Sequence, residues 1–363
     1  MTRQWMGTWV VAATTVLLSA NVWGADLYKL SVGTPEIQSA GPLAFGPDGI
    51  LLIGDTKGAA IVAIQTGDKS GSPATARYAI DDLGGKIAAA IKADASALAV
   101  RDLAVNPLSG NVYVSLSVAG KPGLVRVNAD GQIQQVSLQN VPFSRTALPN
   151  APEDQAGPRG NPRDSSITDI AWVDGQVIVS GTSSAKSPTN LRALSFPFSE
   201  ANEGASLEIY HAAHAKTEDN ARIRTFVPFV IDGKPNLLAG FVCTPLVQFP
   251  LDGLTPGEKL KGKTVAELGN RNQPLDMIVY KKDGQTYLLL SNSARGVMKI
   301  STADIEKNQG LTTPVSGGGT AGQPYDTIGS LTGVEQLDKL NDEYAVVLIK
   351  DGSLLNLKSV ALP

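Results

Sequence analysis

Soft metal ligands and reactive side chains are scarce in this chain of 363 residues, which has one cysteine and two histidines. The single Cys243 excludes an intramolecular disulfide, and no Cys-x-x-Cys-His motif supports covalently bound haem. Aromatic residues make up only 6% of the sequence, whereas there are 37 glycines and 22 prolines. This composition suits many short strands joined by turns.

Concentrated positive charge is also absent. The formal net charge is −3, and no run of Lys or Arg alternates with aromatic residues. Nucleic acid is therefore not an expected partner. After the N-terminal segment, no stretch is long and apolar enough to cross a bilayer, so no membrane span is expected in the mature chain.

The N-terminus has the features of a secretory signal peptide. Arg3 precedes an apolar run over 9–18, and Val22 and Gly24 stand where a signal peptidase reads small residues. The run is too short to span a membrane comfortably. We predict a signal peptide over residues 1–24 and a mature protein, 25–363, that is soluble and either periplasmic or extracellular.

A pattern of three short strands recurs along the mature chain. Each copy has an apolar strand, a turn that often contains Asp-Gly, a second strand, a tight turn and a third strand. The six copies cover residues 41–64, 101–127, 168–194, 224–249, 275–300 and 332–357. Copies of this kind, recurring about every fifty residues, are typical of the blades of a β-propeller.

The sequence therefore predicts an all-β fold, a single propeller over 25–363 with six blades. The number would be seven if residues 203–215 form a further blade. The mature N-terminal strand, in DLYKLSVGTPEIQ, has no copy of its own and is expected to complete the last blade and close the ring. The fourth strand of a blade is expected after the third, as in 132–138.

Long connections interrupt the repeat at 69–98, 140–166 and 309–327. Within the first, the spacing of Ile87 and Ile91 predicts a short helix. The glycine-rich SGGGTAG of the third lacks the spacing of a phosphate-binding loop and does not stand between a strand and a helix.

Aspartates recur where the first strand of a copy begins. The aligned residues are Pro42, Asp102, Asp169, Thr225, Asp276 and Gly333. First strands line the channel of a propeller, so Asp102, Asp169 and Asp276 would form an acidic ring able to hold a hard cation such as calcium. The alternative is that each carboxylate accepts backbone N–H groups of a neighbouring segment.

Arginines precede two of these positions. Arg101 and Arg224 would either neutralise the acidic ring or bind an anionic ligand, because a guanidinium recognises carboxylates in a bidentate way.

Both histidines lie in EIYHAAHAKTED, residues 208–219, and Cys243 follows. The topology places His211, His214 and Cys243 on the same face as the acidic ring. Together they are a suitable ligand set for copper or zinc. The alternatives are two surface-loop histidines with one buried cysteine, or a Cys–His nucleophile pair, for which no local catalytic signature exists.

The segments LAFGPDGILLIGD and DMIVYKKDGQTYLLLSNS resemble the NHL and SMP-30 (gluconolactonase) group of propellers, and more loosely propellers with WD40-like or quinoprotein-like blades. Gluconolactonases would imply one divalent cation on the axis. Asp276, and Asp169 as well, fall where that family carries axial ligands. The family's Glu-Gly-Pro is replaced by Ser39-Ala40-Gly41-Pro42, which argues against lactonase activity.

The functional expectation is a secreted binding or accessory propeller. It would hold a small ligand or metal ion, or dock an extracytoplasmic protein partner, at the channel mouth. The alternatives are a metal-dependent hydrolase of the lactonase type and an interaction scaffold without a chemical site. Since propellers host many unrelated functions, the fold alone does not decide whether the protein is an enzyme.

Overall fold

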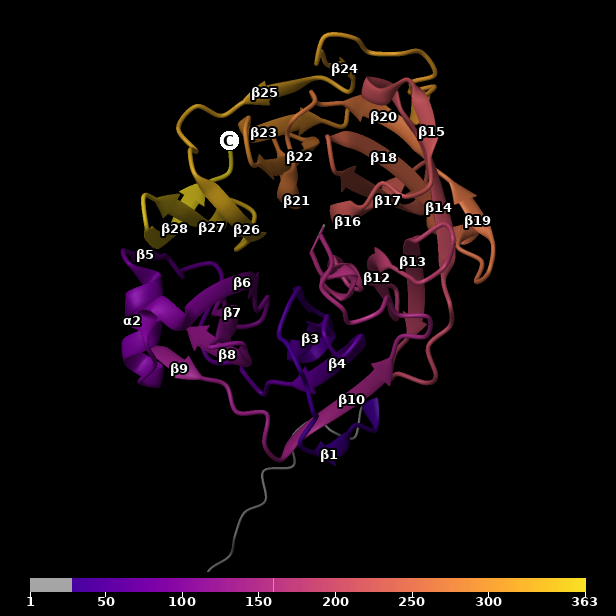
Figure 1. The fold of residues 1–363 in the computed structure, drawn as a ribbon. Coiled ribbons are helices and arrows are strands. Elements are labelled where there is room, and N and C mark those ends of the chain that lie inside the picture. The colour runs from indigo at the N-terminus through magenta and orange to yellow at the C-terminus, as the bar shows by residue number, and fades with distance from the viewer. Residues whose placement is uncertain (1–27, 159) are drawn as a thin grey trace, which may run out of the picture.

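The computed structural model describes residues 28–158 and 160–363. The expected signal peptide lies outside these residues. Six antiparallel sheets stand around a common axis, which confirms the six-bladed β-propeller (Figure 1). Residues 203–215 form no blade of their own, because Ala205–His211 is an outer strand of the third sheet. No helix in the described residues is long and apolar enough to cross a membrane.

The blades are numbered by the order of their first strands. From the axis outward, blade 1 contains β2 (Leu43–Phe45), β3 (Ile50–Asp55), β4 (Ala60–Gln65), β10 (Val141–Ala147) and β1 (Ser31–Gly33). Blade 2 contains β6 (Leu98–Val105), β7 (Val112–Val118), β8 (Lys121–Val127) and β9 (Ile133–Gln135). Blade 3 contains β11 (Asp169–Val173), β12 (Gln176–Thr182), β13 (Thr189–Ser195), β14 (Ala205–His211) and β15 (Lys216–Glu218), with β19 (Lys259–Lys261) parallel to β14.

The other three blades follow in chain order. Blade 4 contains β16 (Ile223–Ile231), β17 (Lys234–Phe241), β18 (Pro245–Pro250), β20 (Lys263–Glu267) and β24 (Ala321–Gly322). Blade 5 contains β21 (Pro274–Lys282), β22 (Gln285–Asn292), β23 (Gly296–Ser301) and β25 (Tyr325–Thr327). Blade 6 contains β26 (Val334–Lys339), β27 (Tyr344–Asp351), β28 (Leu354–Ala361) and β5 (Ala79–Ile80).

Helical segments are few. The α-helix α2 spans Leu83–Ile91, inside the range in which the sequence predicts a helix. The single-turn 3₁₀ helices are η1 (Pro47–Gly49), η2 (Ala95–Ala97), η3 (Pro162–Ser165), η4 (Ala212–His214), η5 (Leu251–Gly253) and η6 (Ile305–Lys307).

Apolar residues fill the space between neighbouring blades, with one cluster at each of the six junctions. Both faces of a strand are buried, so the strands are continuous apolar runs. In β3, Leu52 packs toward blade 3 and Leu51 toward blade 2. A blade cannot bury both faces alone, and the ring supplies the missing partners.

The blades do not follow the ring in chain order. The inner strand of blade 1 contacts those of blades 2 and 3, and the inner strand of blade 2 contacts that of blade 6. The order around the ring is therefore 2-1-3-4-5-6. After blade 2 the chain returns to blade 1 as β10, which pairs with β4, and only then builds blade 3.

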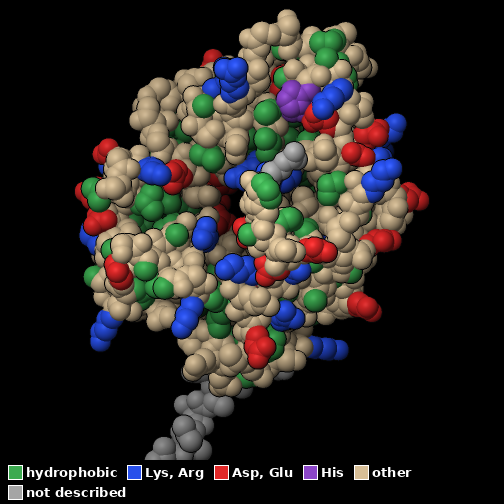
Figure 2. All heavy atoms as spheres, viewed as in Figure 1, with side chains coloured by type: hydrophobic (Ala, Val, Ile, Leu, Met, Phe, Trp, Pro, Cys, Tyr) green, Lys and Arg blue, Asp and Glu red, His purple; other side chains and the backbone are tan. Residues whose placement is uncertain are grey.

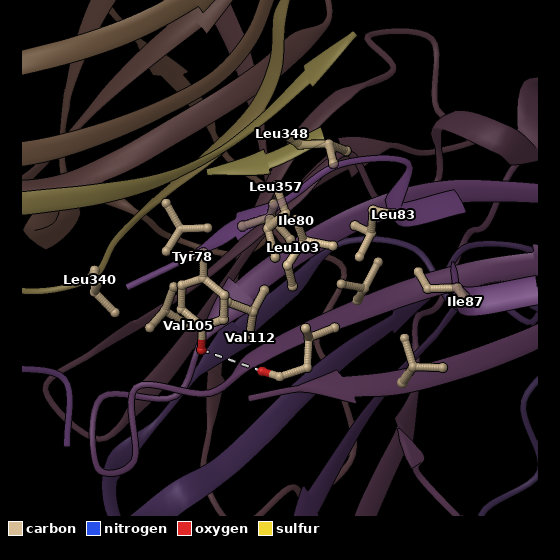
Figure 3. Packing of buried hydrophobic residues seen from close by; sticks show 14 of the residues in the cluster. Tyr78, Ile80, Leu83, Ile87, Leu103, Val105, Val112, Leu340, Leu348 and Leu357 are labelled. Carbon is tan, nitrogen blue, oxygen red and sulfur yellow. Dashed lines mark hydrogen bonds between the residues drawn. The ribbon is translucent and has the colours of Figure 1, made fainter. Parts of the chain in front are cut away.

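The ring closes differently from the sequence expectation. β5 pairs with β28 and completes blade 6, whereas the N-terminal β1 pairs with β10 at the edge of blade 1. The expected closure by the mature N-terminal strand is therefore wrong. The physical reason is burial: the segment after β4 contributes Ile80, Leu83 and Ile87 to the core between blades 6 and 2 (Figure 3).

Tyr78 anchors the start of this closing segment. Its buried hydroxyl donates to the carbonyl oxygen of Gly110 at 2.6 Å and lies 3.4 Å from that of Val127. Replacement Tyr78→Phe is expected to lower the free energy of unfolding by about 1–2 kcal/mol, because a buried carbonyl loses its donor. Urea unfolding measures this change, and an unchanged midpoint would contradict it.

Candidate functional site

The three predicted aspartates line the channel, and each of them accepts a backbone hydrogen bond from a neighbouring blade. Asp102 of blade 2 accepts a hydrogen bond from the backbone N–H of Leu43 in blade 1, at 2.7 Å. Asp169 of blade 3 accepts in the same way from Phe226 in blade 4, at 2.7 Å. The structure therefore supports the alternative in which the carboxylates accept backbone N–H groups.

Blade 5 repeats the arrangement, since Asp276 accepts from the N–H of Leu337 in blade 6 at 2.8 Å. A fourth carboxylate, which the sequence comparison missed, closes the ring: Asp338 of blade 6 accepts from Val105 in blade 2 at 2.7 Å. Four of the six blade junctions thus carry an Asp-to-backbone bond next to the axis.

A β-bulge explains where the two arginines lie. The ladder skips one residue in each of four inner strands, namely Arg101, Arg224, Leu275 and Glu335. The residue after the bulge is Asp102, Thr225, Asp276 and Gln336, respectively. Gln336, not Gly333, is therefore the blade-6 equivalent of the aspartates. A bulge redirects the extra side chain, which places both arginines in the channel lining.

Gln336 links two members of the acidic ring. With its amide nitrogen turned toward the carboxylates, it donates to Asp102 Oδ1 at 2.8 Å and to Asp276 Oδ2 at 3.0 Å. The aspartates of blades 2, 3 and 5 occupy alternate positions in the ring, and Gln336 stands between two of them.

The carboxylates of this ring are poor acids. Each is reached by water through the channel but is otherwise surrounded by protein. Burial raises the pKa of Asp169 to about 7 and that of Asp338 to about 6. Burial, with repulsion from neighbouring carboxylates, also raises the pKa of Asp102 and Asp276 well above the usual value. Near neutral pH the ring is thus able both to donate and to accept hydrogen bonds.

The channel is a cavity of about 1050 Å³ lined by charges of both signs. Its lining includes the acidic ring and the cationic side chains of Arg101, Arg224, Lys57 and Lys121, of which Arg224 is half-buried and the other three are exposed. Figure 2 shows Lys and Arg side chains gathered around this hollow, with acidic side chains inside it. Such a cavity is at the upper end of the usual size for small-molecule sites.

Arg224 is the wall residue with unused hydrogen-bonding capacity. Its side chain is half-buried, and within the described structure its Nε is buried without a partner. Burial, together with the nearby Arg222, lowers its pKa from the ordinary arginine value. Arg101 is more exposed. The adjacent Thr225 also has a buried hydroxyl without a partner in the described residues.

The two histidines lie away from the axis, at the outer edge of blade 3. Glu218 joins them: its Oε2 is 2.8 Å from Nδ1 of His211 and its Oε1 is 2.8 Å from Nδ1 of His214. Among the described residues these three form the one group of His, Cys, Asp or Glu whose ligand atoms lie within 4.8 Å of one another. The two imidazoles lower the pKa of Glu218 to about 2 despite its burial, and burial lowers the pKa of His211.

Cys243 is not a member of this group. It occupies the turn between β17 and β18, where its N–H donates to the carbonyl of Asn272 at 3.1 Å. Glu218 could have been found from the sequence, because the tight turn after His211 pairs β14 with β15 and brings Glu218 back beside Ile209.

The fold and the channel define the class of this protein, a six-bladed β-propeller with a polar central cavity. No protein-family model matches the chain, and no curated protein matches its sequence. The resemblance to NHL and SMP-30 propellers therefore has no family match behind it. A solved structure, the PQQ-bound form of aldose sugar dehydrogenase from Streptomyces coelicolor, matches over 92% of this chain and 98% of that chain. With 12% identity and a TM-score of 0.30, this likeness carries no argument about activity.

Proposed function

We propose that this protein is an extracytoplasmic propeller that binds a small anionic molecule in its central channel. The observation that carries the proposal is Arg224. A half-buried guanidinium in the wall of a cavity of about 1050 Å³ has a buried Nε without a partner in the described structure. A carboxylate or phosphate in the channel would pair with this guanidinium, because arginine binds these groups bidentately.

The acidic ring indicates which anionic molecules the channel would prefer. Asp102, Asp169 and Asp276 are half-buried and reach the cavity, and their raised pKa values favour a protonated, neutral form. Such groups bind hydroxyl groups well. The preferred ligand would thus have its negative group toward the arginines and its hydroxyl groups toward the axis.

The two alternatives have less support. The carboxylate oxygens that would hold an axial cation accept backbone N–H groups, and the described axial carboxylates include no group of three with ligand atoms within 4.8 Å. A lactonase-type metal site is therefore not put forward. A docking scaffold would need an apolar patch. The large hydrophobic side chains exposed in the described part of the chain come from four different blades: Val32, Leu108, Val230 and Leu354.

Binding of hydroxylated anions tests the proposal. Malate and glycerol 3-phosphate are titrated calorimetrically into the mature protein, with uncharged glycerol as the negative ligand. We expect at least one anion to bind with one site per chain. The Arg224→Gln variant should bind it about 10–100-fold more weakly, since a hydrogen bond to a charged group is lost.

Arg145→Gln is the matched control, because Arg145 is exposed on the outer strand β10. It should leave the affinity unchanged. Equal affinity in the Arg224 variant and the wild type, or no heat from either anion, would overturn the proposal.

A further inference from the structure

A second potential site lies at the outer edge of the ring, separate from the channel. The turn η4 brings the rings of His211 and His214 together, with centroids 3.8 Å apart and planes tilted by 36°. Each ring directs its Nδ1 toward one oxygen of Glu218, at 2.8 Å in both cases. The carboxylate thus fixes the orientation of both imidazoles at once.

This contact determines which ring nitrogens remain available. A carboxylate only accepts hydrogen bonds, so each Nδ1 must carry its hydrogen and each Nε2 has a free lone pair. Since the ring centroids are only 3.8 Å apart and both Nδ1 atoms face Glu218, both Nε2 atoms lie on the side away from it. A carboxylate behind the imidazole is the usual support of a metal-binding histidine.

The buried side chain of His211 is an independent indication of a bound ligand. Its side chain is only 1% exposed, and in the described structure its Nε2 is buried without a partner. A buried polar atom without a partner is costly and uncommon. In a histidine whose other nitrogen is held by a carboxylate, a metal ion would complete the bonding.

A second buried polar atom without a partner in the described structure, Oε1 of Glu267, lies beside the turn that carries the two histidines. Glu267, at the end of β20 in blade 4, is fully buried. Its Oε2 is 3.3 Å from the backbone N–H of Ala213, between the two histidines in sequence, and its Oε1 has no partner among the described residues. Glu267 is not in the group whose ligand atoms lie within 4.8 Å of one another, so it borders the two histidines without serving as a ligand.

We propose that His211 and His214 bind a divalent transition-metal ion through their Nε2 atoms, with Glu218 as the residue that orients both rings. Zinc and copper fit a pair of imidazole nitrogens. The site lies at the outer edge of blade 3 and does not depend on ligand binding in the channel. Cys243 has no part in it.

Calorimetric titration of metal-depleted mature protein with Zn²⁺, and separately with Cu²⁺, tests the site. We expect one ion per chain for at least one of the two metals. His214→Ala should weaken that binding at least 100-fold, and this variant should fold because His214 is 40% exposed. Glu218→Gln should weaken it about 10–100-fold, which is the usual effect of removing a supporting carboxylate.

One further variant makes the test specific, since Cys243→Ser should leave the binding unchanged. Binding that survives in His214→Ala, binding lost in Cys243→Ser, or no stoichiometric binding of either metal would each overturn the proposal. Arg224→Gln, which tests the channel, should bind the metal normally, so the two proposals fail independently.

Discussion

The protein is expected to become less stable as the pH rises from about 5 to about 8. The cause is the axial ring, in which burial raises the pKa of Asp169 to about 7 and of Asp338 to about 6, with Asp102 and Asp276 raised as well. In the unfolded chain an aspartate titrates near 4. Between these values the native state binds more protons than the unfolded state, so the free energy of unfolding falls as pH increases.

Other groups modify this trend without reversing it. Glu267, whose pKa burial raises to about 7, acts in the same direction. His211 acts in the opposite direction below about pH 6.5, because burial lowers its pKa. Glu218, with a pKa of about 2, loses its contribution only as the pH falls below about 4.5, outside this window. Since water reaches the carboxylates through the channel, we expect a net loss of about 1–3 kcal/mol between pH 5 and 8.

Urea unfolding at pH 5, 6, 7 and 8 measures the effect. The slope should be smaller in Asp169→Asn, which carries no titrating group at that position. This variant also loses one acceptor for a backbone N–H, so its stability is lower near pH 5, and the slope rather than the absolute value is the result of interest. Asp130→Asn, at an exposed position, should retain the wild-type slope. A wild type that gains stability toward pH 8 would contradict the prediction.

The acidic ring shows what repetition in a sequence can reveal. Asp102, Asp169 and Asp276 were placed at the axis because equivalent residues of repeated blades must occupy equivalent positions. The alignment places Gly333 at the blade-6 position, three residues before the true equivalent Gln336, and it does not identify Asp338. Blade 6 has a glutamine where blades 2, 3 and 5 have an aspartate, so the recurring Asp gives no guide to the register there.

The strand that closes the ring could not be predicted from the sequence, for a different reason. β5 consists of Ala79 and Ile80 alone, and a strand of two residues has no periodicity to detect. The following helix was visible because Ile87 and Ile91 repeat at helical spacing. Where that helix packs, and the return of the chain to blade 1 as β10, are decided by long-range packing, which propensity and local pattern do not encode.

The histidine cluster was predicted in part. His211 and His214 were expected together, and the turn η4 brings their ring centroids to 3.8 Å from each other. The sequence predicts Cys243 in the same site because the topology is expected to place it on the same face, but its ligand atom does not lie within 4.8 Å of the histidines. Glu218 joins them through the hairpin of β14 and β15.

Leu83→Ala is expected to lower the free energy of unfolding by about 3 kcal/mol. Leu83 opens α2 and is fully buried in the core between blades 6 and 2, where Ile80 and Leu348 also lie (Figure 3). Removing three heavy atoms from a packed core costs the lost transfer free energy and leaves a cavity. The loss is large relative to the total stability of a folded domain, about 5–15 kcal/mol.

Val32→Ala is the control for this prediction. It changes the N-terminal strand, which the sequence predicts to close the ring. Val32 lies in β1 at the outer edge of blade 1 and is 61% exposed, so its truncation should change the free energy of unfolding by less than about 0.5 kcal/mol. Urea unfolding of both variants at one pH compares the two segments directly. If β5 and α2 close the ring, only Leu83→Ala should show the large loss of free energy of unfolding. A comparable loss in Val32→Ala would mean that the N-terminal strand forms one of the blade junctions.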